Sequence, residues 1–211
     1  MLAILLFVLA ALALLLVPGP SVLYIVSQSA THGPKGGLVS VAGIDTATLT
    51  HAVAAAFGLS AILLSSALAF DAVKLAGAAY LVILGIRTVF SKHSANSSLA
   101  DMGVPRKRLS RLFAQGYVVN LLNPKTALFF YAFLPQFVVP YQGGVIEQTL
   151  TLGVLFVALA LCTDSMYALT TSAAGQWLSL KACRVLNTQK YITGTTYVAL
   201  GLIAATTSSR T

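Results

Sequence analysis

Long apolar runs separated by short polar turns dominate the pattern along this chain. Most of the runs are roughly 20 residues long, which is the length that a helix needs to cross a bilayer. Their apolar positions are continuous and do not alternate as they do in the strands of a membrane barrel. The pattern predicts an all-α integral membrane protein with six hydrophobic helices, at Leu2–Val26, Leu38–Leu64, Leu68–Phe90, Leu112–Val138, Val145–Ala174 and Tyr191–Ala205.

Two of these segments, the first and the fourth, contain proline within the apolar run. A proline cannot donate its backbone hydrogen bond and clashes with the preceding turn, so we expect both helices to be broken. Asn123 stands directly before a proline, where its side chain suits the N-cap of a following half-helix. The residues at the breaks are Pro18, Gly19 and Pro20 in the first segment, and Asn123, Pro124 and Lys125 in the fourth.

The two halves of the chain share features in the same order. Each half has a broken first segment, an aspartate in its second segment (Asp45, Asp164), and a G-x-x-Y motif in its third (Gly77–Tyr80, Gly194–Tyr197). An odd number of spans in each half gives the halves opposite orientations, so the order predicts an inverted repeat. The expected division of a single transporter domain, 1–211, is repeat one at 1–91, a basic loop at 91–111 and repeat two at 112–211.

Composition supports the membrane interpretation. Hydrophobic residues make up 57% and charged residues 9% of the chain, and the mean hydropathy is +0.87. The net charge is +8, but lysine and arginine gather in the loops after the first, third and fifth segments. The positive-inside rule therefore explains the charge better than nucleic-acid binding does. We expect these loops in the cytoplasm and the C-terminus on the opposite side. Whether the first segment fully spans stays open.

Ionisable residues inside apolar segments are the candidates for chemistry. An ionised carboxylate in hydrocarbon is costly, so Asp45 and Asp164 are expected to face a cavity or a partner. Burial favours the protonated form of a carboxyl group, which suits proton exchange near neutral pH. The alternative is a structural hydrogen bond or a pair with Lys125. Lys125 either attracts a substrate carboxylate or neutralises an aspartate, and its alternative is snorkelling toward an interface.

Polar groups at the breaks are expected to complete a binding site. Asn120 and Asn123 supply amide donors and acceptors. The helix ends freed at Pro18–Pro20 and at Pro124 are expected to face the same cavity, and a helix N-terminus favours an anion such as a carboxylate. His51 lies six residues after Asp45. We interpret it as a packed histidine with satisfied hydrogen bonds, in preference to a proton relay.

Enzyme signatures are absent from the sequence. It contains no G-x-S-x-G, H-E-x-x-H, Walker-type loop or G-x-G-x-x-G. Its two cysteines do not form a C-x-x-C pair, so neither a metal nor a cofactor is expected. A membrane-embedded enzyme or redox carrier is therefore disfavoured, and transport without a nucleotide site is passive or driven by an ion gradient.

The sequence resembles the lysine exporter (LysE/RhtB) family of amino-acid exporters. The resemblance rests on the break at Pro18–Pro20, on Gly33–Gly37, on Gly77–Arg87 and above all on NPKTALFFYAFLPQF at Asn123–Phe137. It implies a multi-pass exporter of amino acids or close derivatives in the bacterial inner membrane, working by proton antiport. The chain departs from the commonest pattern at Ala47 and Thr48 and has a short polar tail.

Other functions stay open at this point. One is a non-transporting membrane scaffold or partner subunit, and another is an exporter of a different small metabolite or a cation. The partners expected of the exporter are a small-molecule amino acid, protons and the lipid bilayer, with a homodimer left open. The sequence does not say which amino acid is carried.

Overall fold

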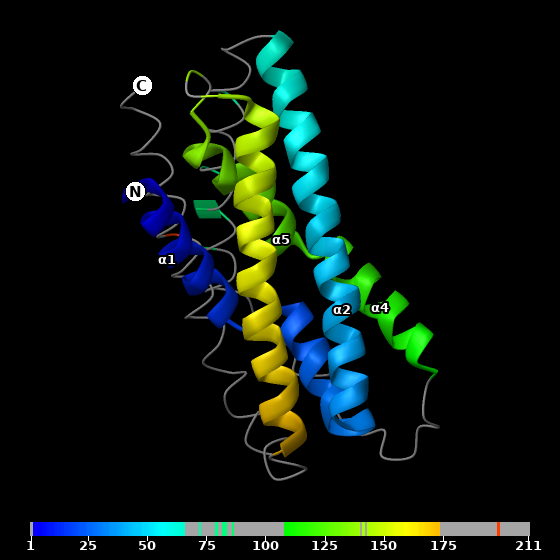
Figure 1. The fold of residues 1–211 in the computed structure, drawn as a ribbon. Coiled ribbons are helices and arrows are strands. Elements are labelled where there is room, and N and C mark those ends of the chain that lie inside the picture. The colour runs from blue at the N-terminus through cyan, green and yellow to red at the C-terminus, as the bar shows by residue number, and fades with distance from the viewer. Residues whose placement is uncertain are drawn as a thin grey trace.

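The computed structural model describes residues 2–65, 108–139, 141 and 143–173, and the single positions 72, 79, 82, 83, 86 and 198. Every element in these ranges is helical, and no strand occurs in them (Figure 1). The predicted all-helical fold is therefore confirmed. Apart from these single positions, the third and sixth predicted segments, with both G-x-x-Y motifs, lie outside the described residues. The count of six helices and the repeat stay predictions.

The first predicted segment is broken where its prolines stand. Helix α1 covers Leu2–Leu16, and helix α2 begins at Pro20. Pro20 occupies the first turn of α2, where a missing N–H costs nothing because that group has no partner inside a helix. The intervening residues 17–19 are not helical. The prediction of a break at Pro18–Pro20 is confirmed.

Helix α2 covers Pro20–Ser65 but reverses direction at Gly33, where φ is 71° and ψ is −169°. Two observations show the reversal: Ile25 shares one hydrophobic cluster with Val41 and Ile44, and a Cβ placed on Gly37 would meet the Ser29 hydroxyl at 2.1 Å. Residues 20–32 and 34–65 therefore lie side by side as a helical hairpin (Figure 1). The connection between the first and second predicted segments is thus a turn at Gly33, and both helices extend to it.

The fourth predicted segment is divided as well. Helix α4 covers Leu109–Leu121 and α5 covers Pro124–Leu128. A π-helical turn, η1 (Phe129–Phe133), and a 3₁₀ turn, η2 (Leu134–Phe137), follow. Pro135 explains these irregular turns, because its ring clashes with a carbonyl one turn earlier and its missing N–H leaves that carbonyl without the usual donor. The break predicted at Pro124 is confirmed, and the helix beyond it does not continue as a regular α-helix.

Two described helices are long and apolar enough to cross a membrane, namely Pro20–Ala61 and Val145–Ala173, while the apolar helix Ala3–Leu16 is shorter. Because α2 reverses at Gly33, residues 34–61 form the long straight part. Large apolar side chains on the helix Val145–Ala173 stay exposed, as a lipid-facing surface requires: Val154, Leu161, Met166 and Leu169.

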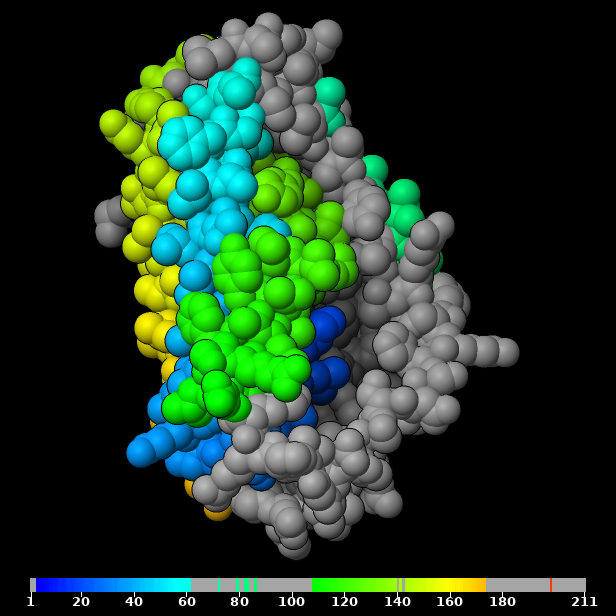
Figure 2. Space-filling view, turned by 90° about the vertical axis from the view of Figure 1, so that its right-hand side faces the viewer, coloured from blue at the N-terminus to red at the C-terminus, as the bar shows by residue number. Residues whose placement is uncertain are grey.

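Two packing regions hold the helices together. Phenylalanines fill the first, where the Phe129 ring lies 4.3 Å from that of Phe156 and 5.7 Å from that of Phe7. The second is the crossing of α2 and α4 (Figure 2). There a Cβ on Gly43 would lie 2.2 Å from the Phe113 carbonyl oxygen, so only glycine fits. Gly43 therefore allows the two helices to approach closely.

Candidate functional site

A small buried cavity lies where the two broken helices meet. Its volume is about 30 Å³, and α1, both parts of the broken fourth segment, the hairpin α2 and the helix Val145–Ala173 all contribute to its wall. Apolar side chains such as Leu14 and Phe156 form part of the wall. The polar side chains that line it are Ser21, Thr48, Asn120, Asn123, Lys125, Thr126 and Asp164.

Asn120 is the centre of the hydrogen-bond network beside this cavity. Its side chain is 1% exposed. Its amide nitrogen donates to the Ile44 carbonyl at 2.9 Å and to the Thr48 hydroxyl at 2.8 Å. Its amide oxygen accepts from the hydroxyls of Ser21 and Thr126, each at 2.8 Å. One side chain thus joins both parts of α2 to α4 and α5.

Asn123 begins α5 as predicted. Its side-chain oxygen accepts a hydrogen bond from the Lys125 backbone N–H at 3.0 Å, which makes it the N-cap. Its amide nitrogen donates to the Ser21 hydroxyl at 2.8 Å. The same residue therefore starts a helix after Pro124 and connects the two breaks.

Lys125 reaches across from the second break to the first. Its ammonium donates to the Val17 carbonyl, and its side chain is 8% exposed, so the alternative of snorkelling toward an interface is wrong. The Tyr167 hydroxyl donates to the neighbouring Leu16 carbonyl at 2.9 Å. These carbonyls form the negative end of the α1 dipole and have no partner inside the helix. Lys125 and Tyr167 therefore cap the C-terminus of α1.

Gly19 leaves room for the Lys125 side chain. A Cβ on Gly19 would lie 3.2 Å from Lys125 Cδ, which is tighter than most real contacts. Pro18 and Pro20 act through the backbone, because they end one helix and start the next. The residues of the first break therefore lie against the side chain from the second.

The two aspartates occupy different places. Asp164 lines the cavity and is 4% exposed. It interacts electrostatically with Lys125 and with Asp45. Asp45 lies outside the cavity wall, is 6% exposed, and has no hydrogen-bond partner in the described part of the chain for either carboxylate oxygen. Sequence analysis assigned both acids the same role, whereas the structure separates a cavity-lining acid, Asp164, from a second acid next to it, Asp45.

His51 is packed and hydrogen-bonded. Its ring stacks on Phe130 at a centroid distance of 6.3 Å, and its Nε2 lies 3.3 Å from the Asn120 carbonyl oxygen. Its Nδ1 lies 3.3 Å from the Tyr131 hydroxyl. The interpretation of His51 as a packed, satisfied histidine is confirmed.

Several polar residues that line the cavity or bond beside it were not predicted as site residues from the sequence. Ser21 and Thr126 follow the two prolines that start α2 and α5, and Thr48 lies one turn after Asp45. For Ser21 and Thr126, the position beside a predicted helix break was the signal that could have identified them as site residues. Tyr167 offered no comparable signal. Among the described residues, no group of three or more histidine, cysteine or acidic side chains is placed to hold a metal ion.

Comparisons with known proteins give a consistent result. The sequence model of the LysE type translocator family matches residues 12–208. The homoserine/homoserine lactone efflux protein of Salmonella typhimurium is 33% identical over 172 residues, which cover 82% of each chain. The uncharacterized membrane protein YrhP of Bacillus subtilis is 28% identical over 197 residues, 90% of this chain and 91% of that protein. No solved structure matches.

Proposed function

Because this chain belongs to the family of LysE type translocators, we propose that it exports amino acids or close derivatives across the bacterial inner membrane. Members of this family are membrane translocators, which fits the interpretation that the chain is not an enzyme. Support for the cargo comes from the relative named as a homoserine/homoserine lactone efflux protein. The long apolar helices fit a membrane location.

The observation that carries the proposal is the buried cavity between the two breaks, with Lys125 and Asp164 on its wall. Helix breaks beside a buried site are how many secondary transporters bind substrate. Lys125 supplies a positive charge for a substrate carboxylate, and the amides freed at the two breaks add donors. A scaffold protein has no use for ionisable side chains around a buried cavity, since each one is costly in a membrane.

The size of the cavity bears on the transport cycle. At about 30 Å³ it holds roughly two water molecules, whereas small-molecule sites measure some hundreds of Å³. Substrate therefore enters in another conformation, in which the two halves have moved apart on one side. In the proposed cycle the two repeats rock against each other around the cavity.

Proton antiport is part of the proposal. Asp164 lines the cavity and interacts with Asp45, so a proton held by these acids changes the charge that a substrate meets. Such a difference in affinity between the protonated and ionised states is what coupling requires. The acids are thus proposed to release protons as substrate binds and to bind them as it leaves.

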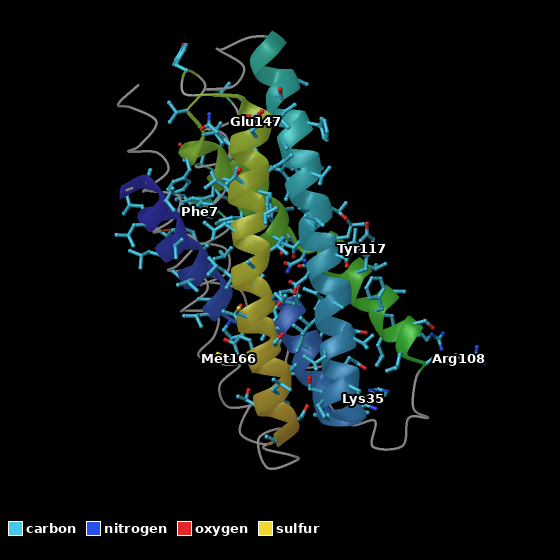
Figure 3. All side chains as sticks on the ribbon, in the orientation of Figure 1. Phe7, Lys35, Arg108, Tyr117, Glu147 and Met166 are labelled. Atoms are coloured by element: carbon cyan, nitrogen blue, oxygen red, sulfur yellow. The ribbon has the colours of Figure 1, made fainter. Side chains whose placement is uncertain are left out.

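Orientation and repeat complete the proposal. Lys35 and Arg108 lie at one end of the molecule and Glu147 lies toward the other (Figure 3). We assign the basic end to the cytoplasm by the positive-inside rule. The proposed repeats, 1–91 and 112–211, each contribute one break to the cavity, as expected of two inverted halves.

The experiment is export from proteoliposomes that contain only the purified protein. Vesicles loaded with labelled homoserine, and separately with labelled threonine, leucine and lysine, are given a pH gradient. The expected result is efflux of at least one amino acid, driven by the gradient and lost in Asp164→Asn. Glu147→Gln, the same change at an exposed position of the same helix, should export normally. Absence of efflux for every amino acid, or full activity of Asp164→Asn, would contradict the proposal.

A further inference from the structure

The amide and hydroxyl groups at the cavity satisfy one another. The Asn120 side chain donates to Ile44 and Thr48 and accepts from Ser21 and Thr126. An amide side chain has two N–H groups and two lone pairs, so these bonds use its full capacity. A ligand must therefore find its partners among other groups of the site.

Unlike these amide and hydroxyl groups, the Asp45 carboxylate has unsatisfied hydrogen-bond acceptors among the residues that the structure describes. Its carboxylate is buried, and neither oxygen has a hydrogen-bond partner in the described part of the chain. A carboxylate removed from water without donors or a counter-charge is costly, so such a group binds a cation or a proton. At Asp45, the atoms without a hydrogen-bond partner are therefore negatively charged acceptors.

Lys125 does not balance both acids. It interacts with Asp164, and its ammonium already donates to the Val17 carbonyl. Two carboxylates beside one ammonium leave one negative charge. Tyr167, on the helix of Asp164, is a further titratable group near the pair. His51, on α2, is directed to Asn120 and Tyr131 instead.

We propose that Asp45 and Asp164 form one site for a single exchangeable positive charge, which the ammonium group of the exported compound and a proton occupy in competition. Asp164 meets the ammonium group in the cavity, and Asp45 adds a second negative charge from the neighbouring helix. The inference rests on the proposed function and adds the chemistry of recognition. A compound must carry a free amine to occupy this charge site, whereas its carboxylate is held separately, beside Lys125.

The test measures protection of the two carboxyl groups from dicyclohexylcarbodiimide, a reagent for protonated carboxyls in apolar surroundings. The purified full-length protein in lipid nanodiscs is treated, and modified peptides are quantified by mass spectrometry. The probes are 3-aminopropan-1-ol, which keeps the amine and hydroxyl of homoserine, and N-acetylhomoserine, which keeps the carboxylate and hydroxyl. Sodium chloride serves as the inorganic cation.

The amino alcohol should slow modification about tenfold at ten times its half-protecting concentration. N-acetylhomoserine and sodium chloride should not protect. The half-protecting concentration should rise up to about tenfold for each unit by which the pH is lowered, because protons compete for the same charge. Failure of the amino alcohol to protect, or equal protection by N-acetylhomoserine or sodium, would overturn the proposal.

Variants separate the pair from the lysine. In Asp45→Asn the remaining acid is balanced by Lys125, so protection of Asp164 by the amino alcohol should be lost, while Asp45→Glu should retain it. Glu147→Gln is the matched control and should behave as the parent protein. Unchanged protection in Asp45→Asn would overturn the shared site. This measurement needs no transport, so an export assay that fails for every amino acid refutes the proposed function without deciding this inference.

Discussion

Proline produces both helix breaks, but the two breaks supply different hydrogen-bonding groups. At Pro18–Pro20 the chain contributes backbone: the Val17 carbonyl accepts from Lys125, and Gly19 leaves room for that lysine. At Pro124 it contributes side chains, with Asn123 as N-cap and Lys125 as donor. One break presents acceptors and the other presents donors. The two breaks are therefore complementary, and each one completes the other.

The largest expected effect is on the network that joins the breaks. Asn120→Leu removes the hydrogen bonds of the Asn120 side chain and leaves the buried hydroxyls of Ser21 and Thr126 without their acceptor. We expect a loss of about 3–5 kcal/mol in unfolding free energy, because each orphaned buried group costs about 1–3 kcal/mol. Unfolding in detergent measures it. Ser110→Ala, at an exposed position of the same helix, should change stability little, and a stable Asn120→Leu protein would contradict the role of the network.

The next effect concerns the donor of the second break. Lys125→Met keeps the volume but removes the charge, so export should fall about 100-fold, or about 2.7 kcal/mol in the barrier. Its stability should change little, since an apolar side chain of similar size often replaces a buried charge without loss. Efflux and unfolding are measured on the same preparation. Lys35→Met, at an exposed position, is the control and should export normally. A variant that exports well would show that the lysine is structural only.

A smaller effect is expected at the first break. Gly19→Ala places a methyl group 3.2 Å from Lys125 Cδ, and the flexible lysine must shift to accept it. We expect a loss of about 1 kcal/mol and a several-fold slower export. Gly58→Ala is the matched control, because a Cβ there meets open space. That change should stabilise helix α2 by up to about 1 kcal/mol. Equal stability and equal export of the two variants would contradict the inference that Gly19 leaves room for the Lys125 side chain.

The smallest effect concerns the second donor to α1. Tyr167→Phe removes the hydroxyl that donates to the Leu16 carbonyl and should cost about 1 kcal/mol in unfolding free energy. Tyr141→Phe, at a position that is 94% exposed, should be neutral. If Tyr167→Phe is equally neutral, the α1 C-terminus depends on Lys125 alone.

Features set by local chemistry could be predicted from the sequence. Proline ends a helix wherever it stands, so both breaks and the Asn123 cap followed from their own residues. The partner of Lys125 could not be predicted, because it is a backbone carbonyl 108 residues away. The difference between Asp45 and Asp164 was hidden for a similar reason: both are acids in apolar runs, and only the packing of the helices decides which one lines the cavity.

Ser21, Thr48 and Thr126 show a second limit. Hydroxyl side chains in helices commonly bond to a carbonyl of the preceding turn, as Thr48 does with the Ile44 carbonyl at 3.1 Å. A threonine that joins two distant helices therefore cannot be distinguished in sequence from one that bonds only within its own helix.

The turn at Gly33 has a consequence for how this sequence can diverge. Its φ of 71° and ψ of −169° lie in a region of backbone space that is essentially restricted to glycine, so asparagine, the usual substitute in left-handed turns, does not fit. Space is not the limit, because a Cβ there would meet nothing within 4 Å. Selection at this codon therefore acts on the backbone alone. In a library of all single substitutions, position 33 should tolerate almost no replacement, while the helical Gly58 drifts freely.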